Sequence, residues 1–104
     1  DPNSGGMESR ANSNTFRYNN IYGNVGAGIR FGGDTADQGI RNDVYGNTIH
    51  DNALGGIKVM RKPQGRVCGN TMYGNNGGNA VGAYPTSISP TAPCAVLSVL
   101  YLPL

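Results

Sequence analysis

Apolar and polar residues alternate in this chain, and asparagine recurs at regular intervals within the alternation. Across residues 42–59, asparagine recurs every five positions at Asn42, Asn47 and Asn52, and single apolar residues fall between them. Such alternation is typical of half-buried strands, whereas a helical period does not fit it. The pattern therefore predicts very short strands, separated by bends near the asparagines.

The same phrase occurs three times along the chain. Residues 14–31 match residues 42–59, and residues 65–83 carry a less regular copy. When the copies are aligned, one apolar column consists of Met7, Ile29, Ile57 and Val81, at intervals of 22, 28 and 24 residues. Units of this length, each with three short strands, predict coils of chain that stack on one another. We expect three nearly complete repeats and a partial one at the N-terminal end.

Asparagine forms two further columns in the aligned repeats. They consist of Asn19, Asn47 and Asn70, and of Asn24, Asn52 and Asn75. An asparagine tolerates a left-handed bend, and its amide can bond both to the turn backbone and to an asparagine one coil away, about 4.8 Å distant. We therefore predict that both columns are structural hydrogen-bonded ladders.

The phrase N-x-I-x-x-N-x-x-x-G-I-x-V, present in residues 47–59 and closely matched in residues 19–31, resembles the repeat of the pectin-lyase-like right-handed β-helix proteins. The resemblance extends to residue 83. It implies an all-β fold, a right-handed parallel β-helix of about 3–4 coils with asparagine ladders. The five-residue spacing also resembles the pentapeptide-repeat β-helix, but the long loops and the Gly-Gly-Ile phrase argue against that alternative.

The point at which the repeat pattern ends divides the chain into three segments. Residues 1–83 are predicted to form the coils, and residues 84–94, rich in Pro, Ser and Thr, an extended linker. Residues 95–104 carry no charge and no polar face, which predicts a buried strand that caps its own coils or is donated to a neighbouring subunit. The residues expected to make this assembly contact are Val96, Leu97, Val99, Leu100, Tyr101 and Leu102.

Composition and charge exclude several classes of partner. The chain of 104 residues carries a net charge of +2, 13% charged residues and no basic run, so we expect no nucleic acid partner. No apolar stretch is long enough to span a bilayer. Cys68 and Cys94 could close a disulfide or remain unpaired thiols; a disulfide, together with the start at Asp1, predicts a processed chain or a fragment that is extracellular or at the cell surface.

Two outward rows of side chains are candidates for polysaccharide contact. Tyr22, His50 and Tyr73 form one row, and Glu8, Arg30 and Lys58 form the other. Aromatic rings in a row could stack on sugars, although they also shield a sheet. His50 and Asp51 could form an acid–base pair only if Asp51 lies in the turn, because adjacent strand residues point to opposite faces.

The resemblance implies a catalytic alternative for the charged row. In polysaccharide lyases with this fold, an Arg or Lys abstracts the proton beside a uronate carboxylate, often with calcium, so Arg30 or Lys58 would be the base. The same row also fits ordinary cross-strand pairing. Asp34 and Asp37 supply too few oxygens for a calcium site. We therefore expect no cofactor, with Ca²⁺ only in the lyase case.

The function predicted from the sequence is structural. We expect a non-catalytic extracellular module that stacks with copies of itself, or with the remainder of a longer β-helix, or donates a strand to build a filament. Polysaccharide is the second expected partner. The alternative is the C-terminal fragment of a uronan lyase or epimerase.

Overall fold

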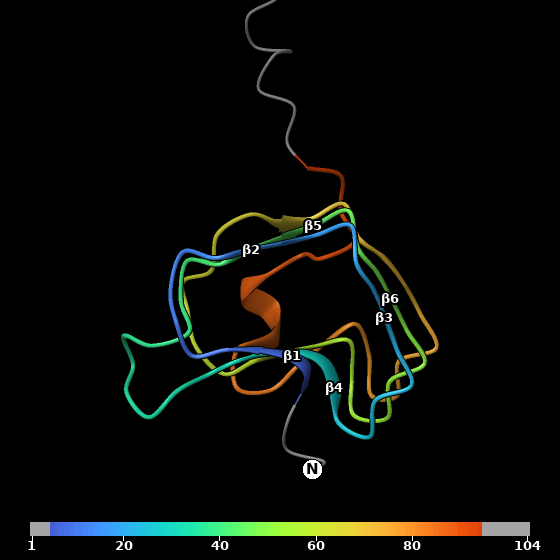
Figure 1. Ribbon diagram of the computed structural model, residues 1–104, viewed down its shortest axis with the longest axis horizontal. Coiled ribbons are helices and arrows are strands. Elements are labelled where there is room, and N and C mark those ends of the chain that lie inside the picture. Colours follow the sequence, from blue (N-terminus) through green and yellow to red (C-terminus); the bar gives the residue numbers. More distant parts are fainter. Residues whose placement is uncertain (1–4, 95–104) are drawn as a thin grey trace, which may run out of the picture.

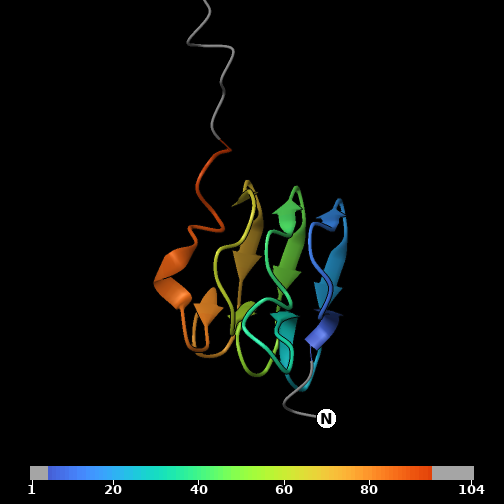
Figure 2. The ribbon, with the colours of Figure 1, turned by 90° about the vertical axis from the view of Figure 1, so that its left-hand side faces the viewer.

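Ten short parallel strands form the three faces of a coil; three complete turns of this coil stack side by side, and β1 adds one strand before them (Figures 1 and 2). The computed structural model describes residues 5–94, so the predicted donor strand at residues 95–104 lies outside the described part of the chain. One sheet contains β1 (Gly5–Ser9), β4 (Ala27–Phe31), β7 (Ile57–Val59) and β10 (Ala80–Val81). The second contains β2 (Thr15–Arg17), β5 (Asp43–Tyr45) and β8 (Val67–Cys68), and the third β3 (Asn20–Tyr22), β6 (Thr48–His50) and β9 (Thr71–Tyr73).

Left-handed backbone bends explain why the strands are so short. The bend falls one residue before each ladder asparagine, for example at Gly46, with φ 69°, before Asn47. Tyr18 and Asp51 adopt the same conformation, with φ 57° and 56°. The sequence prediction assigned this bend to the asparagine itself. Because the preceding residue turns the chain, the asparagine side chain is free to point into the coil.

The asparagine ladders are confirmed, and they follow one bonding rule. Asn47 Oδ1 accepts hydrogen bonds from the backbone N–H and the Nδ2 of Asn19, at 2.9 and 3.1 Å. Asn47 in turn donates the same pair of bonds to Asn70 Oδ1, both at 3.0 Å. The column of Asn24, Asn52 and Asn75 repeats this arrangement. Within the stack, the ladder oxygens of Asn47, Asn52, Asn70 and Asn75 are therefore filled by the coil that precedes them.

A third ladder, which was not predicted, stands at the remaining corner. Asn14 donates its backbone N–H to Asn42 Oδ1 at 3.0 Å, and Asn42 donates its own to Gln64 Oε1 at 3.2 Å. The spacing of Asn14 and Asn42 was visible in the sequence. The rung at Gln64 was hidden because a different residue type takes the place of asparagine.

The apolar column of the first sheet is in register except at its last strand. Met7 pairs with Ile29 and Ile29 with Ile57, as predicted. In the last coil, however, Ala80 pairs with Ile57, and Val81 pairs with Lys58 on the outward row. The predicted position of Val81 in this column is wrong by one residue, because the third repeat is one residue shorter than the alignment assumed. The core consists of Ile21, Ile29, Phe31, Val44, Ile49, Ile57, Val59 and Val67.

Residues 84–94 fold over the last coil, whereas their composition predicted an extended linker. A short 3₁₀ turn, η1 (Pro85–Ser87), lies across the C-terminal end of the stack, and Ile88 packs against the core (Figure 2). The backbone N–H of Tyr84 donates to the carbonyl of Val59 at 3.0 Å. The Cys68–Cys94 disulfide is formed, with 5.0 Å between the Cα atoms, and ties the end of this segment to β8. This segment is a C-terminal cap.

Candidate functional site

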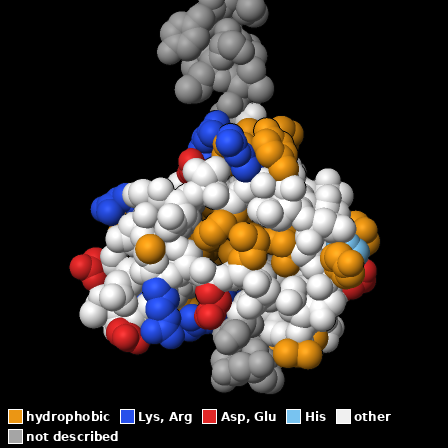
Figure 3. Space-filling view, viewed as in Figure 1, with side chains coloured by type: hydrophobic (Ala, Val, Ile, Leu, Met, Phe, Trp, Pro, Cys, Tyr) orange, Lys and Arg blue, Asp and Glu red, His pale blue; other side chains and the backbone are white. Residues whose placement is uncertain are grey.

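Within residues 5–94, the N-terminal end of the stack is open and apolar. Strands β2 and β3 lie at the edges of their sheets, and within residues 5–94 no strand pairs with their outer sides. Figure 3 looks onto this end and displays an apolar centre inside a polar rim. Met7 on β1 and Phe16 on β2 are only half-buried. A shallow hollow of about 300 Å³ is lined by Gly6, Met7, Asn19, Asn20, Ile21, Tyr22 and Asn24.

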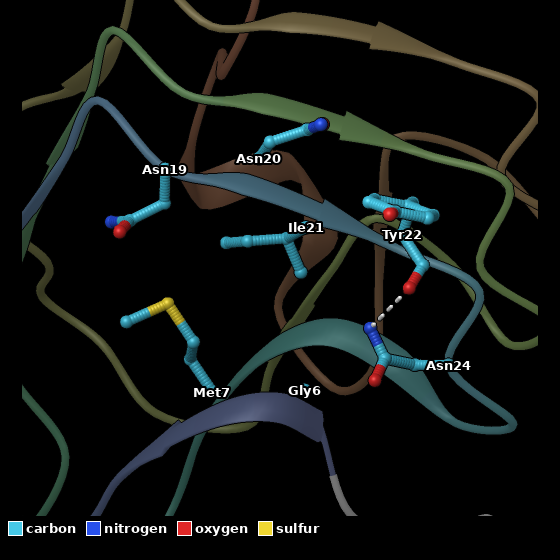
Figure 4. A pocket seen from close by; sticks show the side chains of 7 residues that line it. All are labelled: Gly6, Met7, Asn19, Asn20, Ile21, Tyr22 and Asn24. Atoms are coloured by element: carbon cyan, nitrogen blue, oxygen red, sulfur yellow. Dashed lines mark hydrogen bonds between the residues drawn. The ribbon is translucent and has the colours of Figure 1, made fainter.

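Side chains in this hollow come from two successive coils. In Figure 4, Met7 on β1 and Ile21 on β3 point toward one another, while the ring of Tyr22 lies on the outer side of β3. Strand β1 pairs with β4, one coil further on, so the first sheet begins one strand earlier than the other two. Because the hollow is lined from β1 and β3, it lies where the strand beside β3 in the coil that contains β1 would be.

Hydrogen-bond acceptors stand on the rim of the hollow. Asn19 and Asn24 donate to the next coil as Asn47 and Asn52 do. No group within residues 5–94 donates a hydrogen bond to the Oδ1 atom of either side chain. Gly6 lies directly against the amide of Asn24 and leaves no room for a Cβ, just as Gly28 does beside Asn52. Asn24 thus sits as an interior rung would, with an unfilled oxygen.

The opposite end is closed by the cap in a way that imitates a rung. The carbonyl oxygen of Pro90 accepts both the backbone N–H and the Nδ2 of Asn70, at 3.1 and 3.0 Å. This is the pair of bonds that an asparagine oxygen accepts inside the stack. The last rung of this ladder is therefore filled by the chain itself.

The predicted aromatic row is formed on the third sheet. Tyr22 stacks on His50 with 5.0 Å between ring centroids, and His50 stacks on Tyr73 at 4.7 Å. Because the rings stack on one another, their faces are covered except at the two ends of the row. The row offers solvent mainly ring edges and the two tyrosine hydroxyl groups, with Tyr22 and Tyr73 60% and 52% exposed.

His50 is fixed by hydrogen bonds on both sides of its ring. Asp51 lies in the turn after β6, as an acid–base pair required, and its Oδ2 is 2.6 Å from His50 Nδ1. His50 Nε2 is 3.1 Å from Asn20 Oδ1. Both ring nitrogens are thereby engaged, so neither is directed at a substrate. This arrangement favours a structural role for the pair.

The charged row on the first sheet is aligned as predicted. Glu8 pairs with Arg30 and Arg30 with Lys58 in the strand register. The Arg30 guanidinium forms an ion pair with the Glu8 carboxylate at 3.3 Å, whereas Lys58 forms no ion pair with any residue in the described range. Arg30 is thus held by a carboxylate and Lys58 is the freer cation of the two.

Sequence reasoning missed a basic and aromatic cluster on the second sheet. Tyr18 meets Tyr45 edge to face at 6.2 Å between ring centroids. The Arg17 guanidinium lies over the Tyr18 ring at 5.8 Å and that of Arg66 over the Tyr45 ring at 5.0 Å. The sequence could have indicated that Arg17 and Tyr45 are neighbours in this cluster, since they occupy equivalent positions of successive repeats and pair in the strand register.

The described residues contain no group of three or more His, Cys, Asp or Glu side chains that could hold a metal ion. In the loop after β4, a hydrogen bond from the Thr35 hydroxyl lowers the pKa of the Asp37 carboxyl, with a further contribution from its own backbone N–H. Asp34 lies in the same loop and faces Arg10 at 3.9 Å. The two carboxylates are engaged with groups of the protein.

Comparison with known families decides the classification. The family model described as the right handed beta helix region matches residues 1–90, which include every strand of the stack. The chain belongs to the right-handed β-helix family. Neither the curated proteins nor the solved structures yielded a match to this β-helix. No helix within residues 5–94 is long and apolar enough to cross a membrane.

Proposed function

We propose that this β-helix is a non-catalytic structural module that forms the closed C-terminal end of a larger β-helical assembly. The observation that carries the proposal is the difference between its ends. The last coil is covered by the cap, while the first coil leaves Met7 and Phe16 half-exposed and the outer edges of β2 and β3 without a paired strand in residues 5–94. Soluble proteins pair or cover such edges.

The cap restricts how the module can assemble. Because residues 84–94 cover the last coil, another copy cannot stack its first coil directly on it. A filament of copies would instead need donation of residues 95–104 into the open end of a neighbour, and a larger β-helix would need further coils there. The disulfide supports an extracellular or cell-surface location, because such bonds persist in oxidising compartments.

The test measures solution mass as protein concentration is raised, by light scattering after size exclusion. We expect association through the open end, so Met7→Lys should reduce it because a charge would enter the apolar hollow. Leu54→Lys is the matched control, since Leu54 is 46% exposed and lies in the second coil, away from the hollow. The double substitution Leu97→Asp and Leu100→Asp separates tail donation from coil docking, because only the former needs an apolar tail.

If the wild type and Met7→Lys both remain monomeric at every concentration, assembly of this chain through its open end is contradicted. If Leu54→Lys abolishes association as fully as Met7→Lys does, the open end is not the interface.

Contact with polysaccharide is the second candidate function. The supporting observation is the exposed row that ends in Tyr22 and Tyr73, whose edges and hydroxyls face solvent. Titration with neutral and uronate oligosaccharides tests it. We expect Tyr73→Ala to weaken binding several-fold and Tyr84→Ala, a half-exposed tyrosine on the cap, to leave it unchanged. Equal effects of both substitutions would remove the row as the binding surface.

A further inference from the structure

Three columns of side chains end unfinished at the open end, and their chemistry describes what fits there. Two are the asparagine ladders that begin at Asn19 and Asn24. Inside the stack, Asn47 Oδ1 accepts two hydrogen bonds from the preceding coil, from one backbone N–H and one side-chain NH₂. The Oδ1 atoms of Asn19 and Asn24 occupy equivalent positions and receive no such bonds from residues 5–94. Each oxygen requires a pair of donors.

The closed end shows that the ladder has a direction. There the unfilled groups were the donors of Asn70, and a single backbone carbonyl, that of Pro90, accepts both. A carbonyl oxygen cannot fill the Oδ1 atoms at the open end, because it only accepts, so a segment that covers them has to supply donors. In this fold asparagine supplies two, its own N–H and its side-chain NH₂, to one oxygen of the next coil. The open end therefore favours an asparagine in the preceding coil over a cap that offers only carbonyl oxygens.

The third unfinished column is aromatic. Tyr22 stacks on His50 through one face, and no other ring of the described residues stacks on its opposite face. In all three coils the segment from one ladder asparagine to the next follows one pattern, Asn-x-apolar-aromatic-x-Asn, with His counted as aromatic. The three segments are residues 19–24, 47–52 and 70–75. A coil that extends the stack would place its own ring on the free face of Tyr22.

We propose that the open end binds a β-helical segment that carries this same pattern. Its two asparagines donate to the oxygens of Asn19 and Asn24, and its aromatic ring stacks on Tyr22, while its apolar residue fills the hollow beside Met7. The inference rests on the proposed function and identifies the partner of that surface. The apolar tail at residues 95–104 contains no asparagine, so as an occupant it would bury both oxygens without their side-chain donors.

The register of β1 supplies the design of a test. Gly5 pairs with Ala27, and residues 14–26 immediately precede Ala27. A second copy of residues 14–26, joined directly before Gly5 in place of the first four residues, would therefore provide the two missing strands and the pattern in register. We expect the midpoint of thermal unfolding to rise by about 5 °C or more. Amide exchange in β2 and β3 should slow about tenfold or more.

The matched control is the same fusion in which leucine replaces the copies of Asn19 and Asn24 in the added segment. Leucine has a similar size but no donor, so we expect neither the rise in midpoint nor the slower exchange in β2 and β3. Exchange in β5 and β6 reports in each protein that the remaining coils are intact. Equal protection by both fusions would overturn the ladder inference and leave coil docking in place. Protection by neither would overturn the proposed function as well.

Discussion

At the C-terminal end of the stack, a loop of the chain itself covers the core and fills the last ladder rung, whereas at the N-terminal end the first rung and the apolar hollow meet solvent within the described residues. The two ends carry the same repeat, with an asparagine at equivalent corners and an apolar residue between. The difference between them lies in one segment of 11 residues, 84–94, and one disulfide. It follows that the repeat alone defines the coil, and that added segments decide where the stack stops.

Loss of the disulfide should produce the largest effect on this comparison. In Cys68→Ser with Cys94→Ser, the cap is no longer tied to β8, and a crosslink between residues 26 apart is lost. We expect the free energy of unfolding to fall by about 3–4 kcal/mol, mainly through the added entropy of the unfolded chain. Urea unfolding measures the loss, with the wild type under reducing conditions as the matched reference. A loss below about 1 kcal/mol would mean that the cap is held by its other contacts.

The ladder should be more costly to interrupt inside the stack than at its open end. Asn47 is 1% exposed, and it bonds to Asn19, to Asn70 and to the carbonyl of Phe16. Asn47→Ala therefore leaves several buried polar groups unpaired, and we expect a loss of about 2–3 kcal/mol in urea unfolding. Asn19→Ala removes a half-buried side chain whose oxygen has no donor in the described chain, with an expected loss of at most about 1 kcal/mol. Equal losses for the two substitutions would contradict the inference that Asn19 Oδ1 has no hydrogen-bond donor in the folded monomer.

Much of the fold follows from the sequence because it depends on side chains that recur. The two main ladders and the aromatic row were predicted from equivalent positions, and the structure has them in register. The cap was missed because its central contact is the backbone carbonyl of Pro90, and a carbonyl leaves no signature of residue type. The Pro, Ser and Thr residues of segment 84–94 indicate that it lacks regular structure, but they do not indicate that it packs against the last coil.

The shift at Val81 illustrates a second limit. The alignment placed Val81 beside Ile57 in a column of large apolar residues, whereas strand pairing places Ala80 there. A one-residue shift exchanges the inward and outward faces of a strand. Side-chain type predicted the repeat but not the length of its last unit. The open end was predictable only as an incomplete first repeat, while its unfilled oxygens required the direction of the ladder bonds.

The smallest of the expected effects compares apolar contacts at the two ends. Ile88 on the cap and Met7 at the hollow are both half-buried, and both pack against the core. Ile88→Ala should lower the free energy of unfolding by about 1–2 kcal/mol, because it removes an apolar contact that holds the cap on the core. Met7→Ala should cost less than about 1 kcal/mol in the monomer, since solvent already reaches the hollow. If the two substitutions cost the same in urea unfolding of the monomer, Met7 must be enclosed as well as Ile88 is, and the N-terminal end would have to be covered in solution.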